Sequence, residues 1–170
     1  MRHKILLLDD EVESFAGSLH QSLSSGTWEV MLAESLQQAV EKSDAGEIDL
    51  LVMSLDSPTA AGWDAIDEIT KEDPFLPVIV VSRRPELRNL AEAVGALALV
   101  EKPVDVPALV QIMQELLAEP LQSRMRRTYA QDIDFRRVPR AGGSFREQLD
   151  RRYTTPYHFI TPAPRWGLNE

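Results

Sequence analysis

The sequence predicts an α/β fold in which a doubly wound parallel sheet of five strands is followed by an extended C-terminal tail. Over residues 1–120, short apolar runs alternate with segments whose apolar residues recur at helical spacing. The runs are almost continuous in Val, Ile and Leu, as is typical of parallel strands covered by helices on both faces. Beyond residue 120 this alternation stops.

The five strands follow from the apolar runs. KILLL, IDLLVM, PVIVV and LALV are runs of the kind found in buried strands, and TWEVML alternates between apolar and polar residues. The predicted strands cover residues 4–8, 27–32, 48–53, 77–81 and 97–100.

Five helices are predicted between and after these strands. In the first, Val12, Phe15, Leu19 and Leu23 recur at the spacing of one helix face. Asp105 is the expected N-cap of the last, because a carboxylate there can accept from the first free backbone N–H groups. The predicted helices cover residues 11–24, 34–45, 63–71, 85–94 and 105–118.

The charge distribution divides the chain into two parts. Residues 1–120 contain 8 Lys and Arg against 22 Asp and Glu, a net charge of −14, whereas residues 121–170 contain 10 Arg against 5 acidic residues. The second part also holds 7 of the 11 aromatic residues. We therefore expect an acidic domain over 1–120 and a basic, aromatic extension over 121–170.

Composition excludes several classes of protein. The chain has no cysteine, which excludes disulfides, thiolate metal sites and cysteine nucleophiles. Its three histidines are too far apart in the sequence to predict a zinc site. No apolar run is long enough to span a membrane, and the N-terminal run is too short for a signal peptide. A cytoplasmic protein without membrane contact is expected.

Polar residues directly follow the predicted strands. In a doubly wound sheet, ligands bind beyond the carboxyl ends of the strands, so these residues are the candidates for a site. The acidic pair after the first strand could hold a hard cation through oxygen, and the lysine after the fifth brings a positive charge to the same edge. The candidates are Asp9, Asp10, Ser54, Asp56, Ser82, Arg83 and Lys102.

Four segments together resemble the receiver domain of two-component response regulators. They are LLLDDE, DLLVMSLDSPTAAGWD, PVIVVS and GALALVEKP, in the order and at the spacing of that family, and the resemblance covers residues 4–118. The resemblance implies a flavodoxin-like fold with strand order 2-1-3-4-5 and a role in phosphorelay signal transduction.

The resemblance also assigns roles to the strand-end residues. The family binds magnesium through the first acidic pair, places a hydroxyl after the fourth strand, and joins the lysine after the fifth to proline by a cis bond. Asp9 and Asp10 match the acidic pair, Ser82 the hydroxyl, and Lys102 the lysine before Pro103.

The phosphoacceptor does not match. The family has an aspartate at the end of the third strand, and its position relative to Asp49, Pro58 and Gly62 is occupied here by Ser54. A serine hydroxyl needs a base to attack a phosphoryl group, and losing the carboxylate should weaken magnesium binding. Arg83 replaces a small residue and Leu99 replaces the aromatic switch residue. The chain therefore resembles a pseudo-receiver, which requires no cofactor and binds magnesium weakly at most.

Other readings of the same residues stay open. Asp56 would be the acceptor of a working receiver if the strand continued to it, although a carboxylate in the following loop is favoured. Asp9 and Asp10 are expected to pair with Lys102 and Arg83 in preference to holding magnesium. Ser54 is expected to be a hydrogen-bonded hydroxyl and not a phosphosite.

We expect a binding module without enzymatic activity, which acts through protein contacts. One expected surface for a partner or a second copy is residues 85–118, with Arg88, Glu92, Glu101 and Asp105 as its charges. The tail is the other, because arginines and aromatic residues are favoured anchors of protein interfaces. The same composition suits nucleic acid, which is the less favoured reading. The tail anchors are Arg136, Arg137, Tyr157, Phe159 and Trp166.

Overall fold

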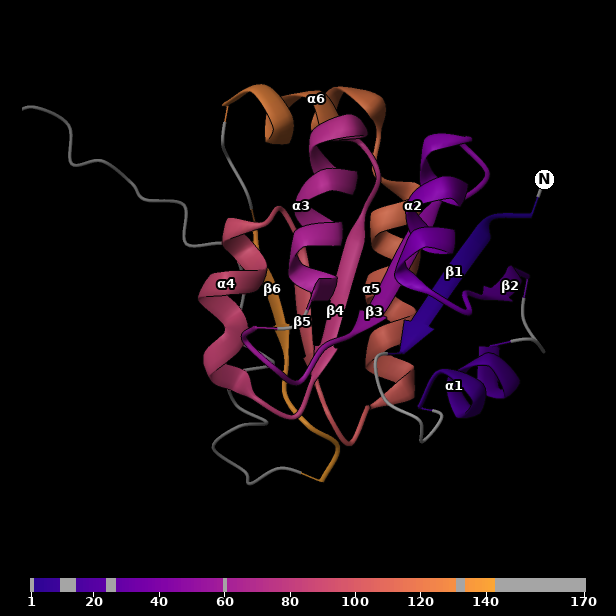
Figure 1. Cartoon of the computed structure of the whole chain (residues 1–170), viewed down its shortest axis with the longest axis vertical. Helices are drawn as coiled ribbons and strands as arrows, with labels where there is room; N and C mark the ends of the chain where they lie inside the picture. Colours follow the sequence, from indigo (N-terminus) through magenta and orange to yellow (C-terminus); the bar gives the residue numbers. More distant parts are fainter. Residues whose placement is uncertain (1, 10–14, 24–26, 60, 131–133, 143–170) are drawn as a thin grey trace, which may run out of the picture.

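The computed structural model describes residues 2–9, 15–23, 27–59, 61–130 and 134–142. Its centre is a parallel sheet with strand order β2-β1-β3-β4-β5-β6 (Figure 1). The predicted order 2-1-3-4-5 is therefore confirmed and extended by one strand. The strands are β1 (Lys4–Asp9), β2 (Glu29–Leu32), β3 (Leu50–Ser54), β4 (Val78–Ser82), β5 (Ala98–Glu101) and β6 (Arg136–Val138).

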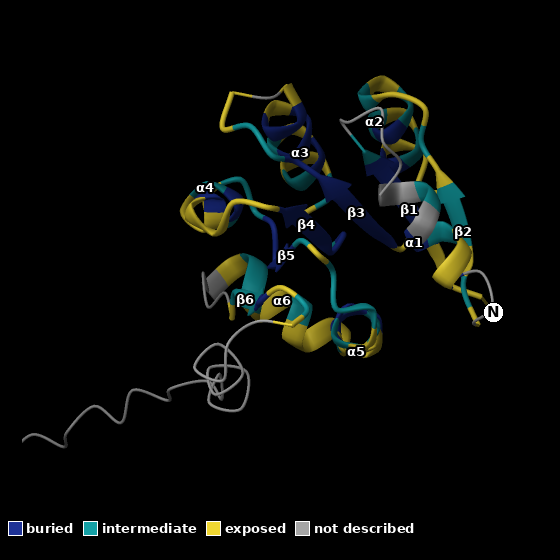
Figure 2. Ribbon diagram, turned by 90° about the horizontal axis from the view of Figure 1, so that it is seen from below, coloured by how far each residue is buried: buried dark blue, intermediate teal, exposed yellow. Residues whose placement is uncertain are grey.

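Helices cover both faces of the sheet (Figure 2). Alternate residues of β1 point to opposite faces, so Leu6 and Leu8 pack with α2, α3 and α4, whereas Ile5 and Leu7 pack with α1 and α5. The continuous apolar strands thus mark a sheet buried on both sides, as predicted. The helices are α1 (Phe15–Leu23), α2 (Leu36–Asp44), α3 (Ala61–Glu72), the short 3-10 turn η1 (Pro85–Leu87), α4 (Arg88–Ala93), α5 (Val106–Ala118) and α6 (Leu121–Ala130).

Two local predictions are confirmed. The Asp105 carboxylate caps α5 by accepting from the backbone N–H of Ala108 at 3.1 Å. The Lys102–Pro103 peptide bond is cis. Among the described residues, no helix is long and apolar enough to cross a membrane.

The first part of the tail folds onto the body, unlike the extended tail of the prediction. Pro120 separates α5 from α6, and its carbonyl accepts from Ser123 and Arg124 as the first turn of α6 forms. The chain then adds β6 in parallel beside β5, with Val100 opposite Val138. Residues 143–170, which include the predicted anchors Tyr157, Phe159 and Trp166, lie outside the described residues.

The outer edge of β5 is covered by this added strand. Glu101, only 4% exposed, accepts from the Arg137 guanidinium at 2.5 and 2.6 Å. The Arg88 guanidinium lies 5.6 Å from the centre of the Phe135 ring. Glu101, predicted to reach a partner, is therefore engaged within the chain, and Asp105 serves as a helix cap.

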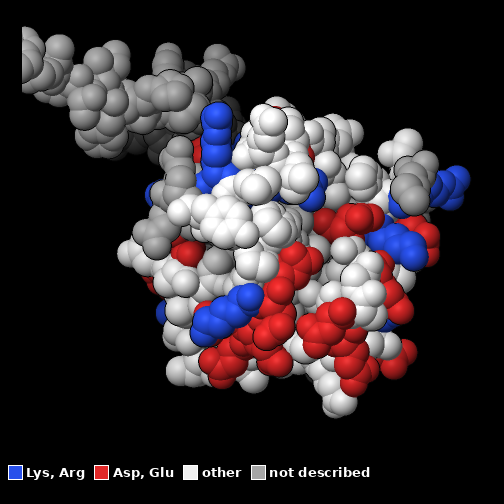
Figure 3. Space-filling model, turned by 90° about the horizontal axis from the view of Figure 1, so that it is seen from above, with Lys and Arg blue, Asp and Glu red and all other residues white. Residues whose placement is uncertain are grey.

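The end of the molecule that carries α6 has an uneven distribution of charge. Figure 3 looks onto this end and shows acidic side chains gathered on one side, next to a largely uncharged area. Exposed acidic residues belong to α2 and α3, among them Glu41, Glu68 and Glu72. Leu121, Met125 and Tyr129 of α6 are 65%, 44% and 74% exposed.

Candidate functional site at the carboxyl ends of the strands

The candidate site lies at the edge of the sheet onto which Figure 2 looks. Ser54 is the last residue of β3 and lies opposite Asp9 of β1, while Ser82 ends β4 and lies opposite Glu101 of β5. Lys102 follows β5 directly. Parallel strands bring all these ends to one edge, which is why the sequence could predict their proximity.

Asp56 completes the site from the loop between β3 and α3. The Lys102 Nζ donates to Asp56 Oδ2 at 3.0 Å and to the Ser54 hydroxyl oxygen at 2.5 Å. The other carboxylate oxygen of Asp56, Oδ1, accepts from the Ser82 hydroxyl at 3.0 Å and from the backbone N–H of Arg83 at 2.6 Å. One carboxylate thus accepts hydrogen bonds from an ammonium, a hydroxyl and a backbone amide.

The site is largely shielded from water. Ser54 and Ser82 are fully buried, and the side chains of Lys102 and Asp56 are 8% and 15% exposed. Burial acts to raise the pKa of Asp56, but the hydrogen bond from the Arg83 N–H, the bond and charge of Lys102, and the Ser82 hydroxyl together lower this pKa. Asp56 is therefore held as the anion.

The loop that carries Asp56 is fixed by contacts with α3. A Cβ on Gly62 would collide with the end of the buried Leu55 side chain, so the leucine would have to shift if another residue stood there. The Trp63 indole N–H donates to the carbonyl of Ser57 at 2.6 Å. These contacts hold the residues on both sides of Asp56 against α3.

The structure adds contacts of Asp56 that were not predicted from the sequence. The residue lies beyond the end of β3, in the loop as predicted, yet its carboxylate points into the site. It forms ion pairs with Lys102 at 3.0 Å and with the Arg83 guanidinium at 3.7 Å. Asp9 lies at the same edge, and Asp10 is outside the described residues.

The described residues alone do not form a site for a divalent cation, and Asp10 of the predicted acidic pair lies outside them. No group of three or more acidic or histidine side chains in the part of the chain that the structure describes could hold a metal ion. The acceptor position contributes the Ser54 hydroxyl, and the Lys102 ammonium 2.5 Å away would repel a cation there. We therefore derive no chemical step through magnesium.

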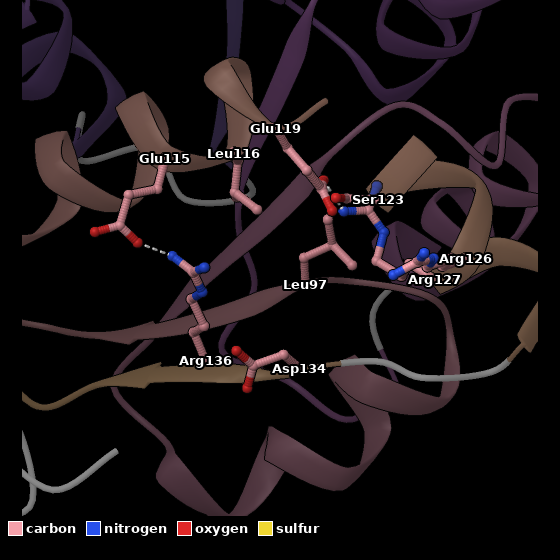
Figure 4. A pocket seen from close by; sticks show the side chains of 9 residues that line it. All are labelled: Leu97, Glu115, Leu116, Glu119, Ser123, Arg126, Arg127, Asp134 and Arg136. Atoms are coloured by element: carbon pink, nitrogen blue, oxygen red, sulfur yellow. Dashed lines mark hydrogen bonds and ion pairs between the residues drawn. The ribbon is translucent and has the colours of Figure 1, made fainter. Parts of the chain in front are cut away.

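A cavity at the opposite edge was not predicted from the sequence. It measures about 270 Å³ and lies between the end of α5, α6 and the start of β6 (Figure 4). Glu115 pairs with Arg136 and Glu119 with Arg127 across this region. Predicted tail anchors Arg136 and Arg137 therefore form ion pairs with the body. The lining residues are Leu97, Glu115, Leu116, Glu119, Ser123, Arg126, Arg127, Asp134 and Arg136.

Comparisons with known proteins agree with this geometry. Residues 5–114 match the family model of the response regulator receiver domain. The chain is 31% identical over 142 residues, 82% of its length, to the DNA-binding transcriptional regulator NtrC of a Bradyrhizobium strain. It is 28% identical over 124 residues, 70% of its length, to the transcriptional regulatory protein GlrR of Escherichia coli. The matched segments make up only 29% and 28% of those two relatives.

Solved structures show the same fold. The signal receiver domain of an HD domain-containing protein from Pseudomonas fluorescens matches with a TM-score of 0.64 and 25% identity, over 74% of this chain and 93% of that one. A response regulator receiver domain protein from Methanospirillum hungatei matches with a TM-score of 0.62 and 22% identity, over 74% and 98% of the two chains.

Proposed function

The chain belongs to the response regulator receiver domain family, and on this basis we propose that it is an atypical receiver that signals without taking up a phosphoryl group. It acts as a binding module of a two-component system in the cytoplasm, through protein contacts, and not as an enzyme. This proposal concerns the receiver, because the chain spans less than a third of the regulators NtrC and GlrR that it resembles.

The observation that carries the proposal is the environment of Ser54. This serine ends β3, where the family has its acceptor aspartate, and its hydroxyl oxygen accepts from the Lys102 ammonium at 2.5 Å. A hydroxyl becomes a nucleophile only when a neighbouring base removes its proton, and an ammonium that is already protonated cannot do so. Among the hydrogen bonds of the described residues, Ser54 has no base as its partner, which favours a hydrogen-bonded hydroxyl over phosphoryl transfer.

The proposed contact surface is the outward side of α6 together with the helices of residues 85–118. Leu121, Met125 and Tyr129 are spaced four residues apart, so they lie on one side of α6, and all three are exposed. Large exposed apolar side chains that lie together are typical of interaction sites. Because β6 covers the edge of β5, the helices and not the strand would supply the contacts from residues 85–118.

Nucleic-acid binding is less well supported than protein contact. Arg124 donates to the carbonyls of Leu117 and Glu119, and Arg127, Arg136 and Arg137 pair with acidic residues of the body. Arginines that already serve the chain's own acceptors have less capacity to neutralise phosphates. Salt-dependent binding to DNA or RNA that is lost on reversing the charge of exposed Arg126 would favour the nucleic-acid reading.

Phosphoryl uptake is tested by incubating the full chain with acetyl phosphate and magnesium and measuring its intact mass. We expect no gain, whereas a receiver that retains the acceptor aspartate gains one phosphate under the same conditions. A gain that disappears in Asp56→Asn would identify Asp56 as the acceptor of a working receiver. A gain that disappears in Ser54→Ala would instead identify a serine phosphosite.

A further inference from the structure

Three hydrogen-bond donors at the strand ends converge on one point. They are the Lys102 ammonium after β5, the Ser82 hydroxyl at the end of β4, and the backbone N–H of Arg83 in the following loop, at 3.0, 3.0 and 2.6 Å from the Asp56 carboxylate. A cation, a hydroxyl and an amide directed at one place form the donor set that binds an oxyanion. Here the oxyanion is a side chain of the same protein.

Asp56 reaches this donor set from a different element. It belongs to the loop after β3, whereas the donors come from β4, β5 and the residues that follow them. Both carboxylate oxygens are used, since Oδ2 accepts from Lys102 and Oδ1 accepts from Ser82 and Arg83. The two oxygens therefore lie where two oxygens of a free oxyanion would bind to the same donors.

We propose that the Asp56 carboxylate is the resident ligand of the donor set formed by Lys102, Ser82 and the Arg83 N–H, and that it occupies the place of an external oxyanion. A ligand attached to its own site competes at a high effective concentration, and the loop contacts of Gly62 and Trp63 hold it in place. An external oxyanion would have to displace Asp56 and would then lie beside a second negative charge. The site is therefore closed to small oxyanions while Asp56 is ionised.

Occupation by Asp56 also organises the loop after β4. The Ser82 hydroxyl donates to Asp56 and its oxygen accepts from the backbone N–H of Arg84 at 3.1 Å. Two successive residues of this loop, Arg83 and Arg84, are thus connected to the carboxylate, one directly and one through Ser82. The chain's own carboxylate holds the loop in an anion-bound arrangement without a phosphoryl group, so this inference deepens the proposed function and rests on it.

Inorganic phosphate is the probe for this site, because it binds reversibly and cannot phosphorylate the protein. In the full-length wild type, we expect the amide resonances of Arg83 and Arg84 to stay unchanged as phosphate is added. In Asp56→Ala, these resonances should shift and saturate, with an affinity at least about tenfold above that of the wild type. Lys102→Ala in the Asp56→Ala background should abolish the saturable shift.

The matched control is Asp64→Ala, which removes one negative charge from an exposed position on α3. This control should resemble the wild type, so a gain of phosphate binding there would attribute the effect to net charge and overturn the proposal. Asp56→Asn preserves the shape of the side chain, and it replaces Asp56→Ala in the titration if Asp56→Ala does not fold. Equal phosphate binding by the wild type and the Asp56 variants, or none by any of them, would also overturn it.

This titration is independent of the proposed function's own test. Covalent uptake from acetyl phosphate by the wild type, detected by mass, would refute a receiver without phosphoryl transfer. Reversible phosphate binding by the wild type, detected by the amide shifts, would refute only the role of Asp56 as resident ligand.

Discussion

At the scale of single residues, Asp56 is the side chain on which the site depends. Its carboxylate accepts hydrogen bonds from the Lys102 ammonium, the Ser82 hydroxyl and a backbone N–H, in a region with little access to water. Charge-assisted hydrogen bonds of this kind are stronger than those between neutral groups. The protonation state of Asp56 should therefore be measurable in the stability of the whole fold.

We predict that Asp56 makes the protein less stable in acid. In the unfolded chain this carboxyl takes up a proton near its ordinary pKa of about 4, whereas the folded-state pKa is lower. The ionised group contributes fully to the free energy of unfolding above its unfolded-state pKa. This contribution is lost as the pH falls through its folded-state pKa. Urea unfolding of the wild type and Asp56→Asn should show stability curves that approach each other as the pH falls below about 4. A difference that is constant with pH would contradict the prediction.

The sequence predicted which strand-end residues meet but not how Asp56 is directed. Ser54, Ser82 and Lys102 follow strands, so the topology of the sheet alone brings them together. The direction of Asp56 depends on a loop whose path is set by Leu55 against Gly62 and by the Trp63 hydrogen bond to Ser57. No periodic pattern in the sequence encodes such contacts.

At the scale of elements, β6 is attached to the body by pairing with β5, by the buried Val138 and by two ion pairs. Glu101 is buried in β5 and its carboxylate is paired with Arg137 of β6, while Val138 is the buried apolar residue of that strand. Arg136, its neighbour in β6, pairs with Glu115, whose side chain is 45% exposed. The two ion pairs join the same strand to the body, but their carboxylates differ greatly in access to water, since the Glu101 side chain is 5% exposed.

We predict that Arg137→Ala destabilises the fold much more than Arg136→Ala does. Arg137→Ala leaves Glu101 as a buried charge without its partner and should lower the free energy of unfolding by about 3 kcal/mol. The second breaks a solvent-exposed pair and should cost about 1 kcal/mol or less. Chemical denaturation measures both, and Glu101→Gln in the Arg137→Ala background should recover part of the loss. Equal losses in the two single variants would count against this account of β6.

The strand β6 could not be predicted from the sequence, for a physical reason. It has three residues, two of which are arginines, so it lacks the apolar run or alternation by which strands are recognised. Its stability comes from pairing with β5 and from the acidic residues it meets, which are distant in sequence. The five helices predicted within residues 1–120 and the five longer strands, by contrast, carried helical spacing or apolar runs, and their described parts lie within a few residues of the predicted ranges. The helix α6 was not among those predicted.

At the scale of the whole molecule, part of the positive charge of the tail is paired with negative charge of the body in the same chain. Residues 1–120 carry a net charge of −14, and four arginines of α6 and β6 contact acceptors near the end of α5 and on β5. While these arginines face the body, the apolar residues Leu121, Met125 and Tyr129 are exposed. This orientation leaves α6 with an outward surface suited to a protein partner.

We predict that the outward side of α6 carries partner affinity. Replacing Leu121 and Tyr129 together by serine should weaken retention of a bound protein partner by at least about tenfold, because buried aromatic and apolar anchors dominate interfaces. The matched control replaces exposed Glu68 and Glu72 of α3 by serine and should retain the partner. Pull-down with the full chain measures retention, and sedimentation shows whether the partner is a second copy. Equal retention by both double variants would contradict the prediction.

The short strand β6 also affects the tendency of the protein to aggregate at high concentration. Without it, β5 would present unpaired N–H and C=O groups beside the apolar residues Ala98, Leu99 and Val100, and another chain could add a strand there. A three-residue strand with two arginines is a poor template for such addition, because it is short and charged. The ion pair of Arg137 with Glu101 therefore protects against aggregation as well as supporting the fold, since it helps to keep the protective strand on the edge of β5.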